Sequence, residues 1–129
     1  MAVNAATHYE NITEMWKEFM GDNFHFGYFE TEDTDLPRAA RAMVEKMLQP
    51  CRVSKESRIL DVGCGIGGPA FYIHEHHGCA VDGISTSRKG VETASRIAGD
   101  KGCENVRFKV ADGVDNGFGD ETFDLVWIM

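Results

Sequence analysis

The stretch Arg58–Ala70 reads RILDVGCGIGGPA, and the expected fold is built outward from it. Ile59, Leu60 and Val62 form a short apolar run, which is typical of a strand buried on both faces of a parallel sheet. Four of the next six residues are glycines, so the backbone can turn sharply and a ligand can approach it closely. Pro69 then suits the first turn of a helix. The pattern strand, glycine loop, helix predicts a nucleotide-like ligand.

Two ligand classes compete for this loop. Gly63, Gly65 and Gly68 have the spacing of the dinucleotide-binding fingerprint, and Asp82 lies about where its ribose-binding acid is expected. This predicts an NAD- or FAD-binding oxidoreductase domain. The competing interpretation rests on Asp61, an acidic residue at the end of a buried strand and two positions before the first glycine.

The stretch LDVGCGIGGPA resembles motif I of the class I S-adenosylmethionine (SAM)-dependent methyltransferases. In that family the glycine loop lies along the methionine part of SAM, which implies this role for Gly63, Gly65 and Gly67. The leading acid helps to hold the amino group of the cofactor, which implies this role for Asp61. SAM carries an ammonium and a sulfonium that a carboxylate attracts, whereas a pyrophosphate would be repelled. We therefore favour SAM over a dinucleotide.

The same resemblance implies contacts to the rest of the cofactor. The acid that usually binds the ribose hydroxyls is replaced here by Ser85, as is frequent in one subgroup of the family, and Asp82 would then lie within the strand. If that strand ended early, Asp82 would take the ribose instead. Asp112 corresponds to the residue that binds the adenine exocyclic amine, with a backbone N–H next to it at Gly113.

The N-terminal segment is rich in aromatic residues. Tyr9, a following Trp and the sequence HFGYFE at 25–30 resemble the N-terminal signature of the subgroup that contains sterol, tocopherol and antibiotic-sugar methyltransferases. There these segments cover the cofactor and the acceptor, which implies that Tyr9, His25 and Tyr28 are lid residues. The alternative from the residues alone is a packing loop that plugs the domain.

The hydrophobic periodicity predicts an α/β fold. Strands are expected at 58–63, 79–84, 106–111 and 123–129, with helices between them, in a Rossmann-like parallel sheet of order 3-2-1-4. Two N-terminal cap helices are expected before the sheet, ending near residues 20 and 48. We thus expect an N-terminal helical lid over residues 1–50 and a SAM-binding half-domain over residues 51–129.

Composition excludes several function classes. A net charge of -8 and a pI near 5.0 argue against nucleic acid as a partner. The four cysteines lack zinc spacing, and His74–His77 does not form H-E-x-x-H, so no metal site is expected. There is no signal-peptide pattern and no apolar window long enough to span a bilayer. We expect a soluble, cytoplasmic protein with reduced cysteines.

The sequence thus predicts a SAM-dependent methyltransferase, or its cofactor-binding half, that methylates an O, N or C atom of a small-molecule acceptor and releases S-adenosylhomocysteine (SAH). A non-catalytic SAM-binding module is the alternative within the same fold. The resemblance covers about the first half of such an enzyme, and the sequence ends directly after the expected fourth strand. We therefore expect self-association, or a partner chain, at the 123–129 edge.

Overall fold

The protein contains one four-stranded parallel sheet. The structure is a computed structural model that describes residues 15, 17, 18, 23 and 25–129. The strand order is β3-β2-β1-β4, and every neighbouring pair is parallel. The strands are β1 (Arg58–Val62), β2 (Ala80–Ser85), β3 (Val106–Val110) and β4 (Leu125–Ile128). The predicted order 3-2-1-4 is confirmed, and β4 is shorter at both ends than the 123–129 strand expected from the sequence.

Three helices are described in full, before and between these strands, and their ends follow from the local sequence. They are α2 (Leu36–Leu48), α3 (Gly68–His77) and α4 (Arg88–Lys101). The Asp35 side chain caps α2 by accepting a hydrogen bond from the Arg38 N–H, and Ser87 caps α4 in the same way. Gly78 ends α3 in the left-handed conformation, which glycine adopts readily.

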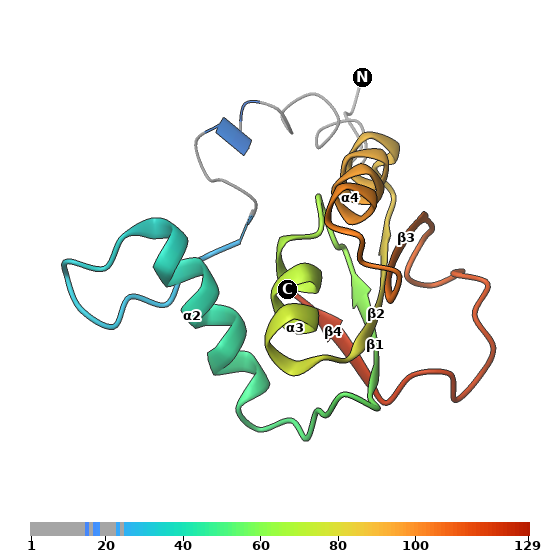
Figure 1. Ribbon diagram of the computed structural model, residues 1–129, viewed down its shortest axis with the longest axis horizontal. Coiled ribbons are helices and arrows are strands. Elements are labelled where there is room, and N and C mark those ends of the chain that lie inside the picture. The colour runs from blue at the N-terminus through green and yellow to red at the C-terminus, as the bar shows by residue number, and fades with distance from the viewer. Residues whose placement is uncertain (1–14, 16, 19–22, 24) are drawn as a thin grey trace.

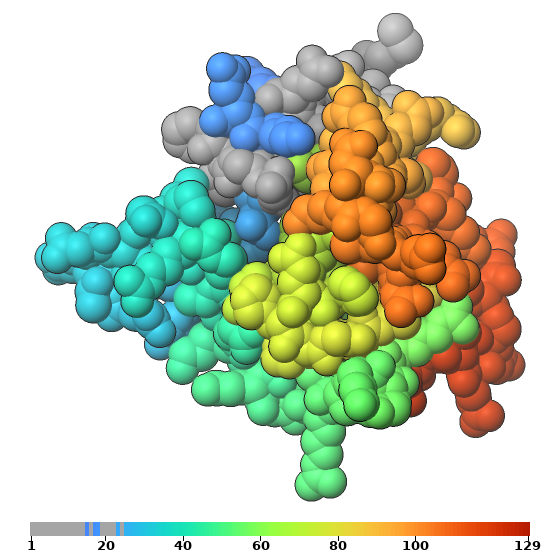
Figure 2. Space-filling model, in the orientation of Figure 1, coloured from blue at the N-terminus to red at the C-terminus, as the bar shows by residue number. Residues whose placement is uncertain are grey.

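The helices lie on one face of the sheet. Figure 1 shows α3 and α4 in front of the strands and α2 beside α3, and Figure 2 shows the three helices as neighbouring ridges of one surface. Right-handed crossovers between adjacent parallel strands place both connecting helices on the same side. The buried core therefore joins all three helices to alternate strand residues. It includes Val44, Leu48, Ile59, Ile73, Val81, Ala98, Val106 and Trp127.

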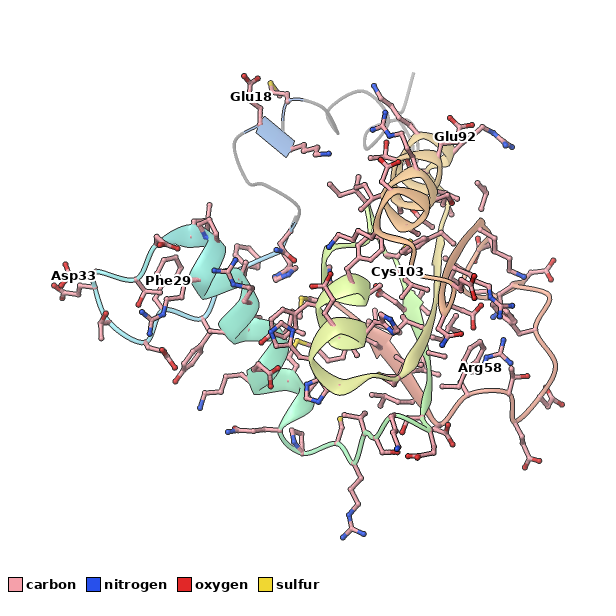
Figure 3. All side chains as sticks on the ribbon, in the orientation of Figure 1. Glu18, Phe29, Asp33, Arg58, Glu92 and Cys103 are labelled. Atoms are coloured by element: carbon pink, nitrogen blue, oxygen red, sulfur yellow. The ribbon has the colours of Figure 1, made fainter. Side chains whose placement is uncertain are left out.

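The opposite face of the sheet is covered in part by the loop 111–124. Arg58 lies on this side, next to the loop in Figure 3, with its guanidinium 3.1 Å from the Asp82 carboxylate and 5.0 Å from the centre of the Phe123 ring. Lys109 stacks over Phe118 in the same loop, 3.9 Å from the ring centre. Aromatic rings and the aliphatic parts of basic side chains thus cover part of this face of the sheet.

The N-terminal region is described only from residue 25 onward, apart from a few isolated positions. Tyr9 lies outside the described residues, and so does the first expected cap helix apart from residues 15, 17 and 18. The second expected helix is α2, which extends the helical layer beside α3. Within the described part of the chain, no helix is long and apolar enough to cross a membrane.

Candidate functional site

The glycine loop turns at the carboxyl end of β1 and is fixed to the neighbouring strand. The N–H groups of Gly63 and Cys64 donate to the carbonyl of Ile84 at 2.9 and 3.0 Å. Gly63, Gly65 and Gly67 all have positive φ, at 77°, 56° and 93°, which favours glycine at each position. The chain thereby makes its turn without side chains that would block access to the strand end.

The glycines serve two different purposes. A Cβ added at Gly63 would have no neighbour within 4 Å among the described residues, which leave the space in front of this residue open. A Cβ at Gly67 would lie 2.8 Å from the rings of both Phe71 and Phe108. Gly67 is therefore explained by packing of the loop against the helix and sheet, and it does not line the cavity described below.

A small cavity lies against this loop. Its walls come from the loop and α3, from the ends of β1 and β4, and from the segment before α2. The lining residues are His25, Asp61, Gly63, Cys64, Gly65, Ile66, Pro69 and Met129. Four of the residues singled out from the sequence (His25, Asp61, Gly63 and Gly65) thus meet here, although His25 is 36 positions away from Asp61 in the sequence.

Asp61 is the polar centre of the cavity. Its side chain is 2% exposed, and Oδ2 has no hydrogen-bond partner among the described residues. Burial raises the pKa of this carboxyl from 3.8 to about 7. A buried, unpaired carboxylate is costly, so Asp61 suits a ligand that brings a cationic or hydrogen-bond-donating group.

Cys64 lines the same cavity but is not a nucleophile. Burial, and to a smaller extent the Asp61 carboxylate, raise the pKa of its thiol well above the ordinary value. The thiol therefore stays protonated at neutral pH, and a protonated thiol is a poor nucleophile. Cys64 acts as a small apolar group in the wall.

Ser85 and Asp112 stand at the ends of adjacent strands, outside the cavity. The Ser85 carbonyl accepts from the Ala111 N–H at 3.0 Å, which joins the end of β2 to the residues after β3. The Asp112 carboxylate accepts from the Val114 N–H at 2.8 Å and so forms a turn. Gly113 follows, and a Cβ there would lie 3.0 Å from Val62. The expected ribose and adenine residues therefore share the carboxyl edge of the sheet with the glycine loop.

Asp82 is not available to a ligand at this edge. It lies opposite Leu60 in the middle of the sheet, three residues before the end of β2. Its carboxylate forms an ion pair with Arg58 on the face away from α3 and α4. The strand does not end early, so the ribose-binding role that the dinucleotide interpretation gave to Asp82 is not supported.

The expected lid residues are placed differently from one another. His25 reaches the cavity, whereas Tyr28 packs on α2, with the Lys46 ammonium 4.9 Å from its ring centre. Phe26 is 91% exposed and Phe29 is 54% exposed, so this segment does not plug the core. Figure 3 shows Phe29 and, farther out, Asp33 on the loop that leads into α2.

The histidines of α3 each have a separate partner. His74 pairs with the Cys79 carbonyl, His76 with the Tyr72 carbonyl and His77 with the Glu45 carboxylate at 2.8, 2.9 and 3.1 Å. The described residues contain no group of three potential metal ligands. These contacts tie α3 to its own end and to α2, which gives the histidines structural roles.

Sequence reasoning missed the apolar part of the cavity wall. Ile66, Pro69 and Met129 line it but carry no chemical signal that separates them from core residues. Met129 lies one position beyond β4, and alternation along that strand places it on the same face as Trp127. The order of the strands, with β4 next to β1, was the signal that could have found it.

Comparison with known proteins gives consistent matches. Residues 59–129 match the family described as "Methyltransferase domain". The methyltransferase GfsG of Streptomyces halstedii is 32% identical over 95% of this chain, and tocopherol O-methyltransferase of Arabidopsis thaliana is 31% identical over 96%. These matches cover 45% and 39% of the two relatives, so the chain spans less than half of their length.

A solved structure is also similar to this chain over most of its length. The crystal structure of the [4+2]-cyclase SpnF superposes with a TM-score of 0.88 at 26% identity. The match covers 95% of this chain and 46% of that one. The similarity therefore extends over nearly the whole of this chain.

Proposed function

Because this chain belongs to the class I SAM-dependent methyltransferases, we propose that it binds SAM at the carboxyl edge of β1 and β2 and transfers the methyl group to a small-molecule acceptor. The observation that carries the proposal is the buried Asp61 Oδ2, unpaired among the described residues, beside a glycine loop with open space at Gly63. An ammonium fits this environment, and a pyrophosphate does not.

Each part of the cofactor has a proposed contact. Asp61 accepts from the amino group, and Gly63 and Gly65 border the methionine part, while Gly67 shapes the loop from behind. Asp112 binds the adenine amine, and the Gly113 N–H lies beside a ring nitrogen. These residues all lie at one edge of the sheet, which is where α/β proteins bind nucleotides.

We propose that the Ser85 hydroxyl binds the ribose by a hydrogen bond. Its hydroxyl oxygen accepts a hydrogen bond from the Ser87 N–H at 3.1 Å. The hydroxyl keeps its hydrogen and a second lone pair, so Ser85 can donate to one ribose oxygen or accept from a ribose hydroxyl, whereas the acid usual in the family only accepts. We propose that ribose binding is correspondingly weaker here than with a carboxylate.

The protein contributes orientation and a dry environment to the reaction. Bound SAM supplies an electrophilic methyl group, which an acceptor oxygen, nitrogen or carbon attacks in line. Residues 1–50 form the lid, with Tyr9, His25 and Tyr28, over the cofactor-binding half of residues 51–129. The apolar wall of Ile66, Pro69 and Met129 excludes water from the methionine side.

The acceptor is proposed to be a small molecule, consistent with relatives named for tocopherol and for a rifamycin. The net charge of -8 argues against nucleic acid. All four cysteines are free, which agrees with the proposed cytoplasmic location.

Binding and methyl transfer must be tested separately, because the structural neighbour SpnF is named as a cyclase. We expect calorimetry to detect SAH and not NAD, and Asp61→Asn to weaken SAH binding by about tenfold or more. A transfer assay with labelled SAM and a panel of phenols, alcohols and amines then tests turnover. Binding of NAD without SAH would refute the assignment of the cofactor. Binding of SAH without transfer to any acceptor would favour the non-catalytic alternative.

A further inference from the structure

Two buried polar atoms without a partner belong to residues that line the same cavity. They are Oδ2 of Asp61 on β1 and Nε2 of His25 in the segment before α2, and neither has a hydrogen-bond partner among the described residues. A buried polar group that stays unpaired destabilises the fold. A pair of such atoms in one cavity indicates a ligand group that satisfies both.

The proton on the His25 ring can be placed from its second contact. Nδ1 lies 2.8 Å from the Phe26 carbonyl oxygen, which can only accept, so Nδ1 carries the hydrogen. In the neutral ring Nε2 then presents a lone pair, because the tautomer is set by the hydrogen bond that the other nitrogen makes. The cavity thus offers two acceptors, one charged and one neutral.

We propose that Asp61 Oδ2 and His25 Nε2 together accept hydrogen bonds from the primary ammonium of the ligand's amino-acid part. An ammonium has three N–H donors and can serve both acceptors at once. A carboxylate in the same place would meet a lone pair at His25 and a like charge at Asp61. The inference rests on the proposed function and adds that the lid recognises the same ligand group as the sheet.

The backbone around His25 is fixed to α2, so the position of His25 relative to the ligand amine depends on this contact. His25 precedes Gly27, whose backbone packs so closely on α2 that an added Cβ would lie 2.6 Å from the Ala39 Cβ. The Tyr28 N–H donates to the Ala39 carbonyl at 2.8 Å, which fixes the segment to the helix. A ligand without the amino group would therefore lose one charged contact and its contact to the lid.

The test is a binding matrix measured by calorimetry. The ligands are SAH, its decarboxylated analogue that keeps the amine, its deaminated analogue that keeps the carboxylate, and 5′-methylthioadenosine, which has neither group. We expect His25→Leu to weaken SAH and the decarboxylated analogue by about tenfold, in line with one charge-assisted hydrogen bond. The affinities for the two amine-free ligands should stay within about twofold of the wild-type values.

Two further variants keep the result interpretable. His25→Gln retains an acceptor near the position of Nε2 and should recover most of the lost affinity. His76→Leu removes a histidine that also pairs with a backbone carbonyl, at 2.9 Å from Tyr72, but does not line the cavity, and it should bind all four ligands as the wild type does.

The possible outcomes distinguish an error in the role proposed for His25 from an error in the proposed function. A wild type that binds none of the four ligands contradicts the proposed function itself. If the wild type binds SAH but His25→Leu weakens all four ligands equally, or none, His25 has no role in recognising the amine. A selective loss for the deaminated analogue would mean that His25 contacts the carboxylate, and the proposal would be wrong.

Discussion

Asp61 combines burial with a function that requires charge. Its carboxyl is 2% exposed, and burial raises its pKa to about 7, so near neutral pH both protonation states are populated. A ligand ammonium would favour the ionised form and lower the pKa again. The buried Asp61 carboxylate thus destabilises the free protein and is stabilised when the ligand supplies an ammonium as its partner.

This residue should make folding stability depend on pH. A carboxyl whose pKa is higher in the folded than in the unfolded state stabilises the fold when protonated. That contribution is complete below the unfolded value of 3.8 and is lost as the pH rises through about 7. We expect Asp61→Asn, which is neutral at every pH, to be more stable than wild type by up to about 4 kcal/mol near pH 8 and about equal near pH 4.

Denaturant unfolding of both proteins across this pH range, without ligand, measures the difference. Parallel stability curves for the two proteins would contradict the raised pKa. The same variant is expected to lose SAH affinity, so stability and binding should change in opposite directions.

Gly63 and Gly67 form a matched pair that separates binding from packing. Both have positive φ, so alanine costs about 1–2 kcal/mol at either site. Gly67→Ala also places a methyl group 2.8 Å from two aromatic rings, and we expect a total loss of about 3 kcal/mol or more in the free energy of unfolding. Gly63→Ala places its methyl in open space next to Asp61, so its larger effect should be on SAH affinity.

Unfolding and calorimetry on the two variants check this prediction. It fails if Gly63→Ala binds SAH as the wild type does, or if Gly67→Ala is no less stable than Gly63→Ala.

At the scale of single residues, the sequence identified residues of unusual type better than it identified their contacts with distant residues. Asp61 stands out in the sequence because an acid in an apolar strand needs a reason to be there, and the structure confirms that it is buried. Gly67 was grouped with the ligand-facing glycines, although Phe71 and Phe108 account for it. Phe108 is 41 residues away, and a contact of that kind cannot be read from local spacing.

Among the elements, α2 determines where the lid segment lies. Ala39 is fully buried, and the Gly27 backbone lies directly against it. We expect Gly27→Ala to displace the 25–29 segment, because the added Cβ would lie 2.6 Å from the Ala39 side chain and 3.1 Å from its carbonyl carbon. SAH affinity should fall severalfold through His25, while the unfolding free energy changes by about 1–2 kcal/mol at most.

Gly99→Ala provides a control for this prediction. Gly99 lies in α4 with no described residue within 4 Å of an added Cβ, so alanine should stabilise the helix by about 0.5–1 kcal/mol without changing SAH affinity. Calorimetry on both variants tests the prediction. Unchanged affinity in Gly27→Ala would show that the lid segment is not positioned by this contact.

The ends of the helices were predictable because they depend on nearby residues. Asp35 and Ser87 are N-caps and Gly78 ends α3, and each residue type favours its position. The contact between α2 and α3 was not predictable, since the His77–Glu45 pair joins residues 32 positions apart. No metal site was expected from the sequence of the histidine cluster, but the partner of each histidine could not be read from it, and the structure shows three separate contacts.

For the whole molecule, strand order followed from physical rules that apply to any such chain. Right-handed crossovers and an expected strand–helix alternation leave few arrangements, and β3-β2-β1-β4 is the one observed. The loop 111–124 was the less predictable part. It crosses the sheet without a helix and covers Arg58 with Phe123, a contact that depends on the whole sheet being assembled.

The two edge strands of this sheet differ in how they are protected. β3 carries Arg107 and Lys109, and charged residues on an edge strand oppose pairing with another chain. β4 reads Leu-Val-Trp-Ile, has no charged residue and pairs only with β1 among the described residues. Val126 and Ile128 are 55% and 66% exposed on the face away from the helices.

We therefore predict that this chain self-associates through β4, because an uncharged apolar edge is an open template for strand pairing. Light scattering over a wide concentration range should show a rising apparent mass, and the double variant Val126→Lys/Ile128→Lys should remain monomeric. Val110→Lys changes an apolar residue of similar exposure, 41%, on the protected edge and should associate like the wild type. A wild type that stays monomeric throughout, or a Val110→Lys variant that is as monomeric as the double variant, would show that the β4 edge does not drive association.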